Sequence, residues 1–106
     1  MNISIQDIKN SFNKYIRIYI GLDKREFDEN MIINKILKIA GDFKKYYVEL
    51  SKIIIEHLEK DETFHKIRLF HIIDSLFKYG AGNYVEQLNK YLYDNFKECY
   101  IISDFE

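Results

Sequence analysis

Apolar residues recur at three- and four-residue steps in five successive segments of the chain, a spacing typical of amphipathic α-helices. The spacing predicts helices at about 4–20, 29–40, 43–59, 62–79 and 83–102. No segment shows the apolar and polar alternation of a β-strand between turn residues. The pattern therefore predicts an all-α fold of about five to six helices, in a single domain over residues 1–106.

Residues with known preferences for helix ends mark the limits of these segments. The expected N-caps are Ser4, Asp28, Asp61 and Asn83, whose side-chain oxygens can accept a backbone N–H of the first turn. Gly41 and Gly80 are predicted to end the second and fourth helices, because glycine tolerates the left-handed conformation that often terminates a helix. The connections between helices are therefore expected to be short.

The segment at 62–79 has the widest apolar arc of the five. On a helical wheel of about 100° per residue, nearly half of its circumference is apolar, formed by Leu69, Phe70, Ile72, Ile73, Leu76 and Phe77. So broad an arc implies contacts with neighbouring helices on both sides. We therefore expect this helix at the centre of the bundle.

A narrow polar strip lies on the remaining arc of the same segment. Asp74 lies three residues after His71 and four before Lys78, so these side chains can meet on one face. In a structural interpretation, Asp74 pairs with Lys78 or His71, and Ser75 bonds back to the carbonyl of His71. In a functional interpretation, Asp74 accepts a hydrogen bond from a ligand and Lys78 binds an anionic group. Spacing alone leaves both open.

Composition narrows the classes of function. The chain has no proline, which favours helices joined by short turns. Its net charge is −1, so it has no general basic field for nucleic acid. His65 and His71 lack metal-ligand spacing, and the single cysteine, Cys99, is expected in an apolar stripe, so neither a metal site nor a cofactor is expected. Phosphate-binding loops and nucleophile motifs are absent, so no enzyme is expected. No apolar run has the roughly 18–20 residues that span a bilayer, so no membrane is expected as a partner.

Two stretches resemble the CTD-interacting domain (CID) family, whose members bind the phosphorylated C-terminal heptad repeats of RNA polymerase II. These stretches are FDENMIINKILKIAGDFKKYYVELSKIIIEHLEK and HKIRLFHIIDSLFKYGAGNYVEQLNKYLYDNFKECY. The residues similar to the family signature are Asp74, Ser75, Leu76, Lys78, the Gly80–Gly82 turn and Tyr84. Phe27–Ala40, which contains Ile32-Ile33-Asn34, is most similar to the branch of the pre-mRNA cleavage complex II large subunit.

This resemblance implies a right-handed superhelix of eight helices, in which the peptide lies between the second, fourth and seventh. The last helices would lie beyond residue 106. In this picture Asp74 accepts the hydroxyl proton of the heptad tyrosine, Ser75 shapes that site and Lys78 lies near a phosphoserine. The full set of expected peptide-binding residues is Asn30, Asn34, His71, Asp74, Ser75, Lys78 and Tyr79.

Three of these positions depart from the family pattern. His71 stands where the family usually has Tyr, Tyr79 replaces a frequent Asn, and Asn30 stands where related members often carry Arg. Contacts with the peptide rings and with phosphate are therefore expected to differ from those of the family.

The resemblance implies a phosphopeptide-binding module of mRNA 3′-end processing and transcription termination, located in the nucleus. Its partners would be the phosphorylated polymerase tail and other 3′-end processing factors. The alternative is a VHS/ENTH-type helical adaptor in membrane trafficking, because that superhelix is similar. Lipid binding of that kind favours a basic first helix, but here Lys9, Lys14 and Arg17 are the cations, against Asp7. Apolar surface left uncovered at the C-terminal face predicts self-association.

Overall fold

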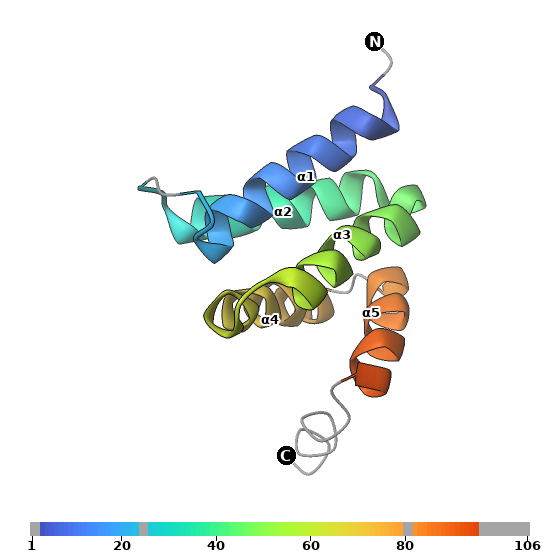
Figure 1. The fold of residues 1–106 in the computed structure, drawn as a ribbon. Coiled ribbons are helices and arrows are strands. Elements are labelled where there is room, and N and C mark those ends of the chain that lie inside the picture. Colours follow the sequence, from blue (N-terminus) through green and yellow to red (C-terminus); the bar gives the residue numbers. More distant parts are fainter. Residues whose placement is uncertain (1–2, 24–25, 80–81, 96–106) are drawn as a thin grey trace.

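The computed structural model describes residues 3–23, 26–79 and 82–95 of the chain (Figure 1). Its elements are α1 (Ile5–Ile20), α2 (Glu29–Asp42), a short 3₁₀ helix η1 (Lys44–Tyr46), α3 (Tyr47–Lys60), α4 (Thr63–Lys78) and α5 (Gly82–Asn95). No strand occurs within the described residues, and the prediction of an all-α fold is confirmed. The right-handed superhelix of the CID family stays a prediction.

The N-caps of the first two helices are those that the sequence predicts. Ser4 Oγ accepts the backbone N–H of Asp7 at 3.1 Å, and Asp28 Oδ1 accepts that of Met31 at 3.2 Å. Each side chain satisfies one of the amide groups that the first turn of a helix leaves without a backbone partner. These two helix starts are therefore fixed by local chemistry.

The boundary between the second and third helices differs from the prediction. Gly41 lies within α2, which continues to Asp42, and among the described residues Gly21 alone has a positive φ. Because Gly41 does not adopt the left-handed conformation, it does not terminate the helix. A 3₁₀ turn then follows, in which Tyr46 N–H bonds to Phe43 O at 2.9 Å, so α3 begins at Tyr47 instead of residue 43.

Two predicted N-caps are wrong. The residue before α4 is Glu62, whereas Asp61 closes α3 and places Oδ2 2.9 Å from Nδ1 of His57. Asn83 lies inside α5, which begins at Gly82. The predicted stop at Gly80, the position of Cys99 and the extension of the last helix to 102 lie outside the described residues.

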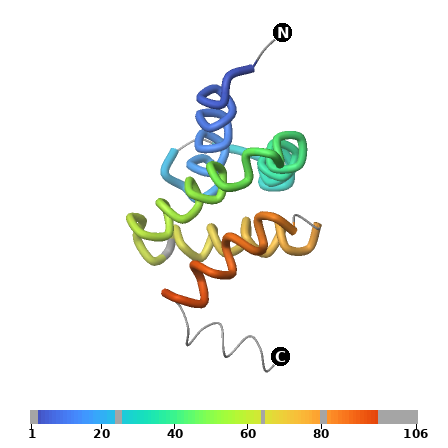
Figure 2. The backbone as a smooth tube through the Cα atoms, turned by 90° about the vertical axis from the view of Figure 1, so that its right-hand side faces the viewer, coloured from blue at the N-terminus to red at the C-terminus, as the bar shows by residue number. Residues whose placement is uncertain are grey.

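Helix α4 packs against many neighbours, as its broad apolar arc predicts, but it does not lie in the middle of the described bundle. In both views, α1 and α2 lie together at one end of the molecule, α4 and α5 at the other, and α3 runs between these pairs (Figures 1 and 2). Helix α4 contacts all four of the other α-helices. Its fully buried side chains are Leu69, Ile72, Ile73 and Leu76, whereas Phe70 and Phe77 are partly buried.

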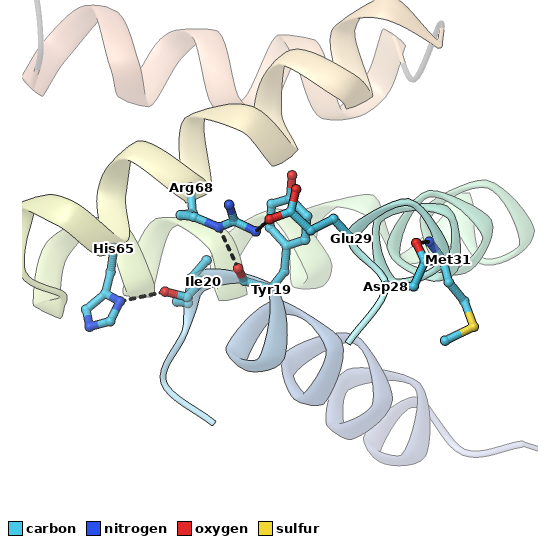
Figure 3. A network of polar contacts seen from close by, with 7 residues as sticks. All are labelled: Tyr19, Ile20, Asp28, Glu29, Met31, His65 and Arg68. Atoms are coloured by element: carbon cyan, nitrogen blue, oxygen red, sulfur yellow. Dashed lines mark hydrogen bonds and ion pairs between the residues drawn. The ribbon is translucent and has the colours of Figure 1, made fainter. Parts of the chain in front are cut away.

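The C-terminal end of α1 is held by side chains of α4 (Figure 3). Gly21, with a φ of 92°, ends α1 in the left-handed conformation that favours glycine. His65 Nδ1 then donates to the carbonyl of Ile20 at 2.6 Å, and Arg68 Nε donates to that of Tyr19 at 2.8 Å. Carbonyl groups that a helix end leaves without partners are thus satisfied by another helix.

Arg68 also reaches the start of α2 (Figure 3). Its second terminal nitrogen lies 2.9 Å from Glu29 Oε1, and its guanidinium stacks 4.4 Å from the centre of the Tyr19 ring. A guanidinium group can make these contacts together because its donors form a planar fork and its face packs on aromatic rings. Arg68 therefore joins α1, α2 and α4.

Candidate functional site

The polar strip of α4 is formed by His71, Asp74, Ser75 and Lys78. Three of them are exposed, and Ser75 is half-buried. Asp74 Oδ2 lies 3.1 Å from Lys78 Nζ, and Ser75 Oγ donates to the carbonyl of His71 at 2.9 Å. The contacts of the structural interpretation are thus present. An ion pair so exposed to water contributes little to stability, about 0–1 kcal/mol, so the fold does not depend on it.

A shallow depression lies beside Asp74 on the surface of α4. Its volume is about 310 Å³, and its lining residues are Ile67, Phe70, His71 and Asp74. Ile67 is 57% exposed, and Phe70 is partly buried. The depression therefore offers an apolar wall next to a carboxylate.

One carboxylate oxygen of Asp74 is available to a ligand beside this apolar wall. Oδ2 is taken by Lys78, and Oδ1 has no hydrogen-bond partner in the part of the chain that the structure describes. A ligand with an apolar body and a hydroxyl at its edge fits such a pair of features, because the body packs on Ile67 and Phe70 while the hydroxyl donates to Asp74. Tyrosine has this chemistry.

Helices α2 and α4 run in the same direction and enclose a second depression at their C-terminal ends. Glu29 at the start of α2 pairs with Arg68 in the second turn of α4, and Ala40 and Leu76 lie together near the last turns. This depression, the α2–α4 groove, has a volume of about 380 Å³ and is lined by Leu37, Ala40, Gly41, Lys44, Leu76, Tyr79, Gly82, Asn83 and Tyr84. It lies at the end of α4 that carries Lys78.

Tyr84 lies at the inner side of the α2–α4 groove and is buried. Its hydroxyl donates to the carbonyl of Ala40 at 2.9 Å, and its ring meets the Tyr47 ring edge-on at 6.5 Å. Burial raises the pKa of the Tyr84 hydroxyl well above its ordinary value. The tyrosine that follows the glycine turn in the sequence therefore fastens α5 to the end of α2 and serves the fold.

The structure brings together only part of the predicted peptide-binding set. His71, Asp74, Ser75 and Lys78 share the polar strip, and Tyr79 reaches the groove. Asn30 and Asn34 are exposed on α2, whereas the described residues that line the depression beside Asp74 all belong to α4. Their role in peptide binding stays a prediction.

Lys44 is not among the predicted peptide-binding residues. It belongs to η1, and it lines the groove because the chain turns there from α2 into α3. In the sequence it is one of two adjacent lysines, and nothing in the local pattern separates Lys44 from Lys45. Only the packing of α2, α4 and α5 shows which of the two reaches the groove.

His57 has a structural place between two helices. Its Nε2 lies 2.7 Å from Asn13 Oδ1 on α1, and its Nδ1 lies 2.9 Å from Asp61 Oδ2.

Within residues 3–23, 26–79 and 82–95, no group of three or more His, Cys, Asp or Glu side chains is placed to hold a metal ion. No helix in that part of the chain has the length and apolar character needed to cross a membrane.

Comparison with known proteins identifies no relative of this chain: no protein-family model matches it, and no curated protein or solved structure is significantly similar to it. The resemblance to the CID family stays a prediction from the motif residues.

Proposed function

We propose that this chain is a peptide-binding module that recognises the tyrosine-containing heptad repeats of the RNA polymerase II tail. The observation that supports it best is the arrangement at Asp74, where an uncommitted carboxylate oxygen borders the apolar depression of Ile67 and Phe70. A tyrosine ring packs in the depression, and its hydroxyl donates to Asp74. The biological setting proposed is mRNA 3′-end processing and transcription termination in the nucleus, together with other processing factors.

The position of Asp74 on α4 suits recognition. Helix α4 is anchored by four buried aliphatic residues and contacts every other α-helix, so its backbone offers a rigid support. The ion pair with Lys78 uses Oδ2 and leaves Oδ1 of the carboxylate for a ligand. A site prepared in this way loses little entropy on binding, and most of the ordering cost falls on the disordered peptide, which keeps the affinity modest.

Substitution of Asp74 tests the proposed function directly. A two-heptad unphosphorylated peptide is titrated with the wild-type chain and with Asp74→Asn, and binding is followed by fluorescence anisotropy. The neutral amide replaces a charge-assisted hydrogen bond of about 1.5–3 kcal/mol, so the expected loss of affinity is about tenfold or more. The same titration with a peptide whose tyrosines are phenylalanine completes a double-mutant cycle.

The cycle separates a direct contact from a general loss of charge. If the tyrosine hydroxyl meets Asp74, the two substitutions are not additive, and Asp74→Asn has little further effect on the phenylalanine peptide. Asp42→Asn is the matched control, because Asp42 forms a similar exposed ion pair with Lys38, at 3.3 Å, on α2. Equal binding of the tyrosine and phenylalanine peptides by the wild-type chain would overturn the proposed function.

A further inference from the structure

A third depression lies between α1 and α2, and we call it the α1–α2 groove. Its volume is about 280 Å³, and the described residues that line it belong to these two helices or directly flank them. Its apolar lining is formed by Ile3, Ile8, Ile39 and Phe43. Ile3 is 55% exposed, so part of this apolar surface stays in contact with water.

The two helices bring opposite charges to the α1–α2 groove. Asp7 of α1 is its acidic residue, and Lys35 and Lys38 of α2 are its basic residues. Lys38 pairs with Asp42 at 3.3 Å. Asp7 and Lys35, in contrast, have no ion-pair partner among the residues that the structure describes. Lys35 packs over the Tyr15 ring, 5.6 Å from its centre, which leaves its charge unneutralised, so the groove carries one uncompensated charge of each sign.

A groove with uncompensated charges of both signs is complementary to a second copy of itself. In a two-fold symmetric dimer, a contact of residue i with residue j of the partner is matched by a contact of j with i. Asp7 of each protomer can therefore pair with Lys35 of the partner subunit, and the ion pair forms twice. A groove with one sign of charge would instead repel its own copy and select a partner of opposite charge.

The start of α1 offers the apolar surface that such a dimer needs. In both views the first turn of α1 extends beyond α2, away from the rest of the molecule (Figures 1 and 2). Ile3 and Ile5 are both exposed there. Packing of these side chains against the groove of a second copy removes apolar surface from water, which drives association, while the paired charges fix its register.

We propose that the α1–α2 groove is the interface of a two-fold symmetric homodimer of this chain. The first turn of α1 packs against the partner's groove, and Asp7 pairs with Lys35 of the partner subunit. The sequence predicts self-association at the C-terminal face, whereas this interface lies between α1 and α2. No residue of α4 is among the described lining, so the polar strip with Asp74 remains open in the dimer, and the inference does not rest on the proposed function.

Charge reversal tests the pairing by sedimentation equilibrium over a series of chain concentrations. The wild-type chain is expected to show a reversible monomer–dimer equilibrium. Asp7→Lys and Lys35→Asp are each expected to weaken the dimer about tenfold or more, because each substitution places like charges opposite one another twice. An equimolar mixture of the two variants is expected to regain the dimer, because every contact between one variant and the other joins opposite charges.

Ile3→Asp tests the apolar part of the interface and is expected to weaken the dimer as well. Ile67→Asp is its matched control, because Ile67 is 57% exposed on α4 and does not line the groove. This control is expected to leave the dimer unchanged. Far-UV circular dichroism checks that each variant keeps its helices.

The outcomes of these measurements separate the proposed dimer from other uses of the groove. A wild-type chain that stays monomeric at every concentration would overturn the proposal and leave the groove to a different partner. A dimer that withstands both charge reversals, or that Ile67→Asp weakens as much as Ile3→Asp, would overturn it by placing the interface on another face. Folded charge-reversal variants that stay monomeric when mixed would exclude the reciprocal ion pair. None of these results bears on the Asp74 titration, so the proposed function is tested separately.

Discussion

Tyr84 is a buried residue whose hydroxyl stabilises the packing of α5 on α2. It donates to the carbonyl of Ala40, in the last turns of α2, at 2.9 Å. Tyr84→Phe keeps the ring but leaves that carbonyl buried without this donor, at a cost of about 1–3 kcal/mol. We therefore expect the free energy of unfolding, measured by urea denaturation, to fall by that amount. An unchanged midpoint and slope would contradict this account of the hydroxyl.

The loss of stability caused by Tyr84→Phe is expected to depend on pH. Burial raises the pKa of Tyr84 in the folded chain, whereas the unfolded chain releases the phenolic proton near its ordinary pKa of about 10. The contribution of Tyr84 is therefore complete below pH 10 and decreases as the pH rises above it, by at most about 1.4 kcal/mol per pH unit. Above pH 10 the stability gap between the wild type and Tyr84→Phe is expected to narrow, and parallel curves would contradict the raised pKa.

Single residues could be predicted from sequence where their chemistry is local. Ser4 and Asp28 cap their helices through an amide three residues away, and Ser75 bonds four residues back, so spacing was sufficient for all three. Asp61 was assigned to the wrong helix because its partner depends on where α3 ends. Its neighbour Glu62 occupies the position before α4, and Asp61 turns to His57 instead.

At the scale of the helices, replacing Gly21 or Gly41 by alanine is expected to change the stability of the fold in opposite directions. Gly21 ends α1 with a φ of 92°, and alanine in that conformation costs about 1–2 kcal/mol. Gly41 lies inside α2 with ordinary φ, and a Cβ added there meets nothing within 4 Å. Alanine within a helix is more stable than glycine by about 0.5–1 kcal/mol. Urea denaturation should therefore show Gly21→Ala destabilised and Gly41→Ala stabilised, and a shift of the same sign in both would contradict these roles.

The helices themselves were largely predictable, and their limits less so. The apolar period places all five, and the wide arc of α4 correctly indicates its contacts with several other helices, although α3 holds the middle position. The period does not distinguish a 3₁₀ turn from the first turn of an α-helix, so the start of α3 was placed four residues early. The residue type of Gly41 favours a helix end, but its backbone keeps the helical conformation and α2 continues to Asp42.

Arg68 matters for the whole molecule because it connects three helices. Arg68→Ala removes the hydrogen bond to the carbonyl of Tyr19 and the contact with its ring, and we expect a loss of about 2 kcal/mol in the free energy of unfolding. Glu29→Gln removes only an exposed ion pair and should cost about 0.5 kcal/mol or less. Thermal and urea denaturation of both variants measure the difference. A loss in Glu29→Gln equal to that in Arg68→Ala would contradict this division.

The candidate site illustrates what lies beyond local sequence patterns. His71, Asp74 and Lys78 share one face of one helix, so helical geometry was enough to group them. The α2–α4 groove joins η1, α2, α4 and α5, and its lining exists only after these elements pack. Lys44 and Lys45 have nearly the same neighbours in sequence, so the choice between them required the three-dimensional structure.

The contacts that close α1 also impose an order on the synthesis of the protein. Tyr19 and Ile20 have their carbonyl groups satisfied by Arg68 and His65, which the ribosome adds more than forty residues later. Until α4 has left the exit tunnel, these two carbonyls lack their native side-chain donors. A pause in translation before that point therefore prolongs the exposure of the C-terminal end of α1 to water.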